Sequence, residues 1–323
     1  MVLIRRRIRT LALPLLLGTL ATTTACSSSN TDRDVASRPY LATTSIWADI
    51  SSHTLCGAPV EPIIPLGSDP HSWEPSIRTR GDLESAALVI ANGLDLEEGL
   101  VDLLSTVESQ GTQITYMADY VEVLDAAPDT ADGHDHEHAD EDSHEHHDGD
   151  PHIWLDPVRV ADALPAIVGA AIAAGGDETT LTGCADDYAS ELRSLDRDIA
   201  TALADIAPRD RLLVTNHDAL GYFADRYEFT IVGTVIPSTS THAEANAADL
   251  AELAQTIDDL GIPAIFTDAQ SSEVEATALA ERLDGVEIVP LLTGTLTSGS
   301  EAGATYVALL RTNAELIAEA LAP

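Results

Sequence analysis

The sequence predicts an α/β protein made of two similar lobes, each with a parallel sheet, joined by one long helix. Short apolar runs alternate with helical patterns in the first half of the chain, and the alternation starts again in the second half. A long amphipathic stretch lies between the halves. The chain of 323 residues is also long enough for two domains of ordinary size.

Residues 39–177 are expected to form the first lobe. Its strands are short apolar runs at residues 40–43, 60–64, 88–91 and 113–115. Helical patterns are found at 46–56, 76–86, 96–110 and 157–174. Pro157 favours the last of these helices, because proline fits the first helical turn, where no N–H donor is needed.

Residues 178–207 are expected to form the joining helix. The stretch contains no glycine after Gly183 and no proline until Pro208. A single stiff helix between the lobes would restrict hinge motion, and the alternative is an ordinary helix of the second lobe. Its apolar positions step by three or four residues and share one helical face: Tyr188, Leu192, Leu195, Ile199, Leu203 and Ile206.

Residues 208–323 are expected to form the second lobe. Its predicted strands are the apolar runs at 212–215, 229–232, 264–267 and 287–289. Its predicted helices lie at 218–226, 242–260, 271–282 and 300–320. Strands and helices that alternate in this way are typical of parallel sheets.

Residues 1–25 are typical of a targeting segment. Four arginines stand before an apolar core at residues 11–20, which is too short to span a bilayer. The end of the segment, Ala25 before Cys26, looks like a bacterial lipoprotein cleavage site. In this interpretation Cys26 carries the lipid, residues 26–38 are a polar tether, and the protein lies on the outer face of the cell membrane. In the alternative, ordinary secretory cleavage would remove Cys26.

Two further cysteines, Cys56 and Cys184, remain after the targeting segment. An even pair in an exported protein favours a disulfide. Two buried thiols are the alternative, since spacing alone does not establish contact.

The formal net charge of −38 excludes a nucleic-acid-binding protein on electrostatic grounds. Acids and histidines are concentrated at residues 125–150, and this low-complexity stretch is expected to be a disordered loop because it cannot bury apolar area. Imidazoles attract divalent transition metals, so the loop is a candidate accessory metal site. Its histidines are His134, His136, His138, His144, His146 and His147.

The pattern Asp-Pro-His-x-Trp occurs twice, at residues 69–73 and 150–154. Each proline restricts the backbone next to the histidine. His217 follows the predicted strand 212–215, and ligands of open α/β sheets bind at the carboxyl ends of strands. His71 and His152 of the first lobe and His217 of the second are therefore predicted to hold one metal ion in a cleft between the lobes.

Two histidines outside these motifs, His53 and His242, are expected on the surface. His53 falls in a predicted helix, and His242 falls at the predicted start of another. Either could at most form a weak outer site.

The segments 67–75 (Gly-Ser-Asp-Pro-His-Ser-Trp-Glu-Pro), 150–157 (Asp-Pro-His-Ile-Trp-Leu-Asp-Pro) and 216–223 (Asn-His-Asp-Ala-Leu-Gly-Tyr-Phe) resemble three ligand motifs. These are motifs of the zinc/manganese substrate-binding lipoproteins of bacterial ABC importers, and the resemblance extends over residues 39–323. It implies two lobes around a metal cleft. The acidic histidine loop, and a histidine rather than a glutamate at position 217, are similar to the zinc-specific branch.

The function implied by this resemblance is capture of Zn²⁺ outside the cell. The protein would deliver the ion to an ABC permease and its ATPase on other chains, and is expected to be a monomer without enzymatic activity. The other possibilities are a manganese or broad divalent-metal receptor of the same family, a zinc hydrolase, or a passive zinc buffer or adhesin-like (cell adhesion) surface protein. No His-Glu-x-x-His motif supports the hydrolase.

The fourth ligand is open in this sequence. Family members often carry an aspartate in a late Gly-Thr-Leu-Tyr-Ser-Asp-like run, whereas this chain has Gly299 at that position. Water, a loop histidine, Glu301 or Asp268 could take its place. The carboxylates of Asp69, Asp156 and Asp218, which neighbour the histidines in sequence, are expected to orient the imidazoles. The tryptophans Trp73 and Trp154 are expected either to exclude water from the site or to pack in the core.

Overall fold

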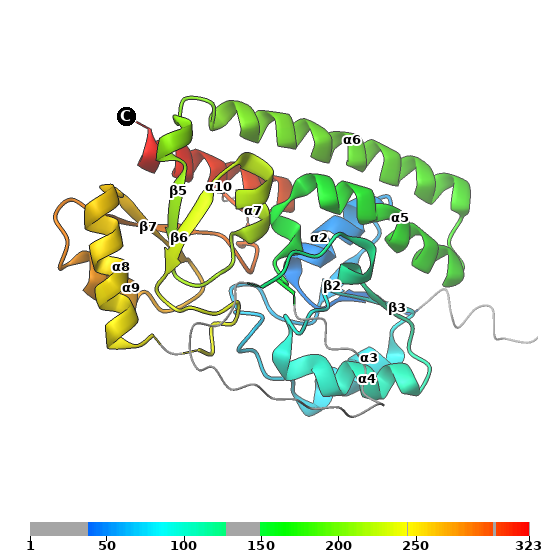
Figure 1. The fold of residues 1–323 in the computed structure, drawn as a ribbon. Helices are drawn as coiled ribbons and strands as arrows, with labels where there is room; N and C mark the ends of the chain where they lie inside the picture. The colour runs from blue at the N-terminus through cyan, green and yellow to red at the C-terminus, as the bar shows by residue number, and fades with distance from the viewer. Residues whose placement is uncertain (1–37, 127–148, 244, 300–301, 323) are drawn as a thin grey trace, which may run out of the picture.

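The computed structural model describes residues 38–126, 149–243, 245–299 and 302–322, which form two α/β lobes side by side (Figure 1). Each lobe contains a four-stranded parallel sheet, so the predicted fold class is confirmed. Within these ranges, none of the helices is both long and apolar enough to cross a bilayer. The targeting segment, Cys26, the six loop histidines and Glu301 lie outside the described residues.

The first lobe is built around a sheet with strand order β2-β1-β3-β4. Its buried strand β3 (Leu88–Ala91) lies beside β1 (Tyr40–Ala42), while β2 (Val60–Pro62) and β4 (Ile114–Tyr116) are the edges. Helices α3 (Ile77–Ser85) and α4 (Val101–Ser109) pack on one face. On the other face lie α2 (Ser45–Thr54) and α5 (Pro157–Ala173).

The second lobe repeats this plan with strand order β6-β5-β7-β8. Its strands are β5 (Leu212–Thr215), β6 (Thr230–Thr234), β7 (Ala264–Asp268) and β8 (Glu287–Leu291). Helices α8 (Ala247–Leu260) and α9 (Val274–Ala280) pack on one face through a separate apolar cluster. The other face is covered by α7 (Gly221–Tyr227) and α10 (Tyr306–Leu321).

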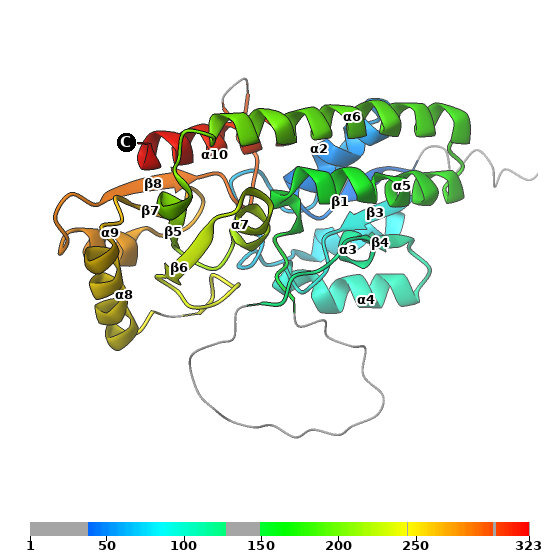
Figure 2. The same cartoon turned by 45° about the horizontal axis from the view of Figure 1, so that its top comes forward.

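Helix α6 (Glu178–Ala202) lies along both lobes (Figure 2). It contacts α2 and α5 of the first lobe and α10 of the second. Its predicted apolar face is buried, including Tyr188, Leu192 and Ile199. The regular helix ends at Ala202, earlier than expected, although Leu203 and Ile206 remain buried beyond its end.

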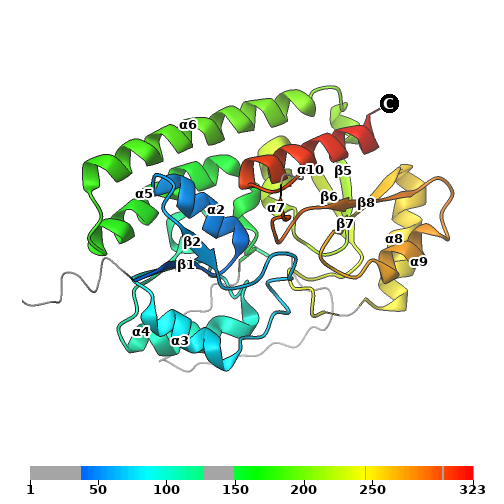
Figure 3. The ribbon, with the colours of Figure 1, turned by 180° about the vertical axis from the view of Figure 1, so that it is seen from behind.

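Cys56 and Cys184 form a disulfide, with an S–S distance of 2.16 Å and a Cα–Cα distance of 5.4 Å. The bond ties the turn after α2 to α6, and Figure 3 shows α2 beneath α6 from behind. The sequence had left two buried thiols as the alternative, and that alternative is wrong.

Helix α8 begins later than the sequence predicted. Asn246 caps the helix, because its side-chain oxygen accepts hydrogen bonds from the backbone N–H groups of Ala248 and Asp249. The helix was expected to begin at residue 242, so the placement of His242 at a helix start is also wrong. The segment 238–243 instead runs as a connection that leads toward the other lobe.

Short 3₁₀ helices complete the description: Glu98–Leu100, Met117–Tyr120, Ile153–Leu155 and Pro208–Asp210.

Candidate metal centre

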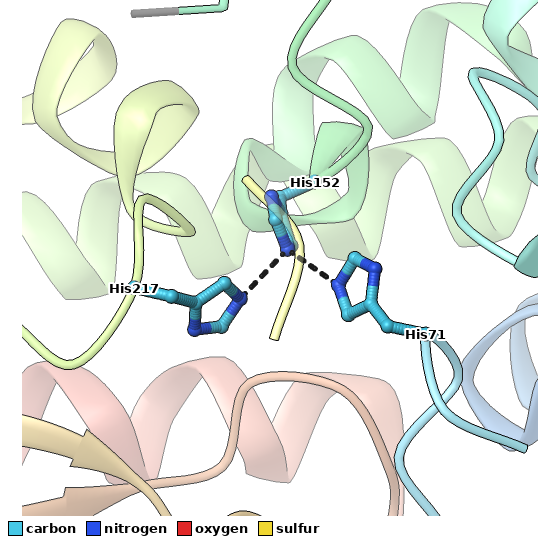
Figure 4. A group of neighbouring side chains, drawn as sticks. All are labelled: His71, His152 and His217. Carbon is cyan, nitrogen blue, oxygen red and sulfur yellow. Dashed lines mark hydrogen bonds between the residues drawn. The ribbon is translucent and has the colours of Figure 1, made fainter. Parts of the chain in front are cut away.

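The side chains of His71, His152 and His217 converge where the two lobes meet (Figure 4). The Nε2 atom of His152 lies 3.3 Å from Nε2 of His71 and 3.2 Å from Nε2 of His217. All three side chains are buried. His71 follows β2, His152 precedes the 3₁₀ helix Ile153–Leu155, and His217 follows β5. Residues separated widely in sequence thus form one cluster of imidazole nitrogens.

The repeated Asp-Pro-His segment folds as the same local turn in both copies. Asp69 Oδ1 accepts a hydrogen bond of 3.1 Å from the backbone N–H of His71. Asp150 Oδ1 accepts one of 2.9 Å from the backbone N–H of His152. Aspartate favours such turns because its short side chain reaches the backbone two residues ahead. The motif therefore fixes the backbone from which each imidazole projects.

His152 is held by Asp150 through its ring as well. The distance from His152 Nδ1 to Asp150 Oδ1 is 2.8 Å. Burial raises the pKa of the Asp150 carboxyl to about 7. Burial, together with the neighbouring rings of His217 and His71, lowers the pKa of His152 well below its usual value. Burial and these neighbours therefore favour the neutral imidazole of His152, which is the form that binds metals.

His217 has a carboxylate partner from a distant strand end. Its Nδ1 lies 2.6 Å from Oδ2 of Asp268, the last residue of β7. Burial by itself would lower the pKa of His217, but the Asp268 charge and hydrogen bond outweigh it and raise that pKa. Burial would likewise raise the pKa of Asp268, but His217 and hydrogen bonds from Thr293 and Asn216 hold it below its usual value.

This arrangement corrects two expectations. Asp218 was expected to orient His217, but the carboxylate at Nδ1 of that ring belongs to Asp268. Asp268 was also a candidate fourth ligand. Because it binds Nδ1, on the side of the ring away from the clustered Nε2 atoms, it orients the imidazole instead.

Asp156 does not orient an imidazole as the sequence suggested. Its side chain caps α5 by accepting hydrogen bonds from the backbone N–H groups of Val158 and Arg159. Asp69 binds the backbone N–H of His71, and the carboxylate near that ring is Glu98, with Oε1 3.7 Å from Nδ1. The His71 imidazole lowers the pKa of the Glu98 carboxyl.

The second lobe reaches across to the loop that carries His71. Thr241 Oγ1 donates a hydrogen bond of 2.6 Å to Asp69 Oδ2, and Ser240 Oγ donates to Glu98. His242 Nε2 lies 3.1 Å from the backbone oxygen of His71. His242 is exposed, as the sequence predicted, and it also contacts the loop of His71, although its ring lies outside the cluster of three.

The two tryptophans of the repeated motif differ in their environment. Trp154 lines the hollow around the histidines, with its ring 5.4 Å from that of His152, and its Nε1–H donates to the backbone oxygen of Thr293. Trp73 is half-buried against the smaller apolar cluster of the first lobe. His53 lies on α2 as expected, half-exposed and stacked on Tyr188.

Sequence reasoning missed several residues around the centre. Tyr222 is buried, and its hydroxyl donates to the backbone oxygen of Asp150 and accepts from the N–H of Leu124. Gln270 and Thr293 line the hollow beside the histidines. Both lie just after strands of the second lobe, so a search of all carboxyl strand ends would have found them.

Two parallel-sheet lobes with three buried imidazoles at their junction define a two-lobed solute-binding protein with a candidate metal centre. A family model described as zinc-uptake complex component A, periplasmic, matches residues 41–320. The chain belongs to this family, which consists of uptake receptors rather than enzymes.

Individual relatives carry the names of different metals. The chain is 29% identical over 201 residues to the zinc-binding lipoprotein AdcA of Streptococcus pneumoniae, which covers 62% of this chain and 38% of AdcA. It is 26% identical over 205 residues to the manganese-binding lipoprotein MntA of Halalkalibacterium halodurans, covering 62% and 60%. The matched part is thus well short of the relatives' full length.

A solved structure covers more of the chain. The periplasmic zinc-binding protein TroA from Treponema pallidum superposes with a TM-score of 0.76 at 25% identity, covering 88% of this chain and 99% of TroA. The Mn-bound periplasmic metal-binding protein from Candidatus Liberibacter asiaticus, at 19% identity and a TM-score of 0.73, shares the fold.

Proposed function

We propose that the protein is an extracytoplasmic receptor that captures Zn²⁺ between its lobes and delivers it to an ABC permease and its ATPase for import. Membership of the zinc-uptake family supports a role in metal import. The names of the relatives, which include both zinc-binding and manganese-binding proteins, leave the choice of metal to the chemistry of the site.

The chemistry of the three imidazoles supports the choice of zinc, and their spacing is compatible with it. Zn–N bonds of about 2.0–2.1 Å in a tetrahedral site place neighbouring nitrogens roughly 3.3–3.4 Å apart. Two of the three pairs agree with that value: Nε2 of His152 lies 3.3 Å from Nε2 of His71 and 3.2 Å from Nε2 of His217, and all three ligand atoms lie within 4.8 Å of one another. Imidazole also suits zinc, whereas manganese prefers carboxylate, carbonyl and water oxygens.

The experiment is metal analysis and calorimetric titration of the mature protein purified without an affinity tag. We expect one tightly bound zinc ion per chain, lost when His71, His152 and His217 are replaced together by alanine. His53→Ala is the matched control, since that imidazole lies outside the cluster. Unchanged tight binding in the triple variant, or manganese displacing zinc at equal concentration, would show that the proposal is wrong.

We further propose that the protein is a monomer held at the outer face of the membrane by a lipid on Cys26. The names of AdcA and MntA as lipoproteins support the anchor. Mass spectrometry of the membrane-extracted protein tests it. A mature N-terminus downstream of Cys26 without added lipid would contradict it.

The acidic histidine stretch is proposed to raise the local zinc concentration near the cleft. Its described ends pair as a bridge between Asp125 and Gly149, and Asp150 N–H donates to the backbone oxygen of Leu124. We expect a variant that lacks residues 130–147 to keep these contacts between the two ends, because they lie outside the deleted residues. We expect fewer zinc ions per chain and poorer growth at limiting zinc; if both stay unchanged, the stretch has no such role.

A further inference from the structure

The three histidines leave the fourth direction of a tetrahedral ion open. Gly299 stands where a carboxylate ligand was considered from the sequence, and it has no side chain to offer. The groups around the three rings are therefore the place to search. Besides the histidines, the hollow is lined by Pro70, Trp154, Gln270, Thr293 and Gly294.

One side-chain oxygen in this lining is uncommitted. Oε1 of Gln270 is buried and has no hydrogen-bond partner among the described residues. The other polar groups are occupied: Trp154 Nε1–H donates to the backbone oxygen of Thr293, and Thr293 Oγ1 donates to Asp268. Because buried carbonyl oxygens are almost always paired, an unpaired one beside three imidazoles indicates a missing partner.

The polarity of the hydrogen bonds fixes which end of the Gln270 amide meets Thr293. Thr293 has one hydroxyl proton, and it is donated over 2.6 Å to Oδ1 of Asp268. Toward Gln270, the same hydroxyl can only accept, so the amide nitrogen Nε2 lies there, 2.8 Å away. Oε1 is therefore the end of the amide that Thr293 does not occupy, and it is buried. The chain of bonds from His217 through Asp268 and Thr293 thus orients the Gln270 amide.

Close packing holds the amide in place. A Cβ atom added at Gly294 would lie 3.0 Å from Gln270 Nε2 and 3.0 Å from Cδ of Pro70, the residue before His71. The amide is therefore packed over a glycine at the junction of the lobes. Among the described atoms, the hollow leaves no room for a water molecule, so a contact between Oε1 and an ion would be direct.

We propose that the side-chain oxygen of Gln270 is the fourth ligand of the ion held by His71, His152 and His217. The inference rests on the proposed function, because it concerns the same ion. A neutral amide oxygen completes a set of three nitrogens and one oxygen without adding charge to a buried centre. The carboxylates Asp150 and Asp268 remain on the Nδ1 side of their histidines.

The test uses the mature protein loaded with one equivalent of Co²⁺, whose visible bands are strong in a four-coordinate site and weak in a six-coordinate one. Azide binds cobalt where a water can be displaced. We expect the wild-type bands to stay unchanged on adding azide, and those of Gln270→Ala to shift, because water replaces the amide. Zinc affinity of this variant should fall about tenfold to a hundredfold.

Three variants sharpen the result. Gln255→Ala, on the exposed face of α8, is the matched control and should behave as wild type. Gln270→Glu keeps an oxygen at the same reach and should stay closed to azide. Azide binding by wild type as strong as by Gln270→Ala would overturn the assignment of Gln270. His217→Ala separates the two proposals, since metal binding unaffected by that change would overturn the proposed function itself.

Discussion

The two lobes present their imidazoles in different ways. In the first lobe, His71 and His152 lie in two copies of one local turn. In each copy, the side chain of an aspartate accepts a hydrogen bond from the backbone N–H of the histidine two residues later. In the second lobe, His217 follows a strand, and its ring is held by Asp268, 51 residues away in sequence. A local motif fixes where a histidine stands, whereas the charge on the ring depends on partners brought by the fold.

The electrostatic consequence differs between the lobes. Burial and the neighbouring rings lower the pKa of His152, so that its ring is ready to bind metal. The Asp268 carboxylate raises the pKa of His217 against the effect of burial, so a proton competes with the metal there. The second lobe is therefore expected to carry the pH dependence of capture.

The largest expected effect comes from removing a ligand from either lobe. The free energy of zinc binding at a four-ligand protein site is roughly 10–16 kcal/mol. Because each histidine supplies part of it, His152→Ala or His217→Ala should each weaken zinc binding about a hundredfold or more. Competition titration with a coloured chelator measures this. A loss below tenfold in His217→Ala alone would mean that the first lobe binds the ion without the second.

The disulfide is expected to affect the stability of the protein rather than metal binding. Cys56 and Cys184 close a loop across 128 residues. Replacing both with serine should lower the free energy of unfolding by about 2–4 kcal/mol, because the unfolded chain gains freedom. Urea denaturation measures it. Zinc affinity should be little changed; a tenfold loss would show that the bond also positions the first-lobe histidines.

Asp268→Asn tests the carboxylate of the second lobe. Such partners of metal-bound histidines typically affect affinity tenfold to a hundredfold, and we expect a loss of about that size. The wild-type affinity should fall as pH decreases through the raised pKa of His217, and in the variant this fall should begin at lower pH. Zinc titrations over a pH series measure both. Asp258→Asn, on exposed α8, is the charge-matched control.

Asp150→Asn tests the carboxylate of the first lobe in the metal-free protein. Burial raises the pKa of the Asp150 carboxyl from 3.8, its value in the unfolded chain, to about 7 in the folded protein. The protonated carboxyl therefore contributes its full stabilisation at pH values below 3.8, and this stabilisation is lost as the pH rises through about 7. The variant should therefore lose less stability than wild type between acidic and alkaline pH. Urea midpoints at several pH values measure this, and parallel curves would contradict it.

The smallest effect is expected where the second lobe contacts the loop of His71. Thr241→Val removes the 2.6 Å hydrogen bond to Asp69, worth about 1 kcal/mol, so zinc should dissociate about fivefold faster. Stopped-flow transfer to a chelator measures the rate. Thr256→Val is the control, since that hydroxyl donates to Glu252 within α8. An unchanged rate would mean that this contact does not limit release.

Much of the fold followed from local pattern. The predicted strand 264–267 corresponds to β7 (Ala264–Asp268), because continuous apolar runs are buried in parallel sheets. The predicted start of α8 was wrong, because the capping side chain of Asn246 decides where the helix begins. The joining helix ended early at Ala202, although its apolar face continued beyond the regular turns.

The sequence by itself determined the lobes, the turns that carry His71 and His152, and the residue types that attract a divalent metal ion. These features arise from neighbours in the chain, from periodicity and from side-chain chemistry. Only the tertiary structure decided that Asp268 rather than Asp218 holds His217, and that Gln270 lies beside the three rings. Those contacts join strand ends that are far apart in sequence. The burial of the side chains at these strand ends shifts their pKa values, and no local sequence pattern reveals such shifts.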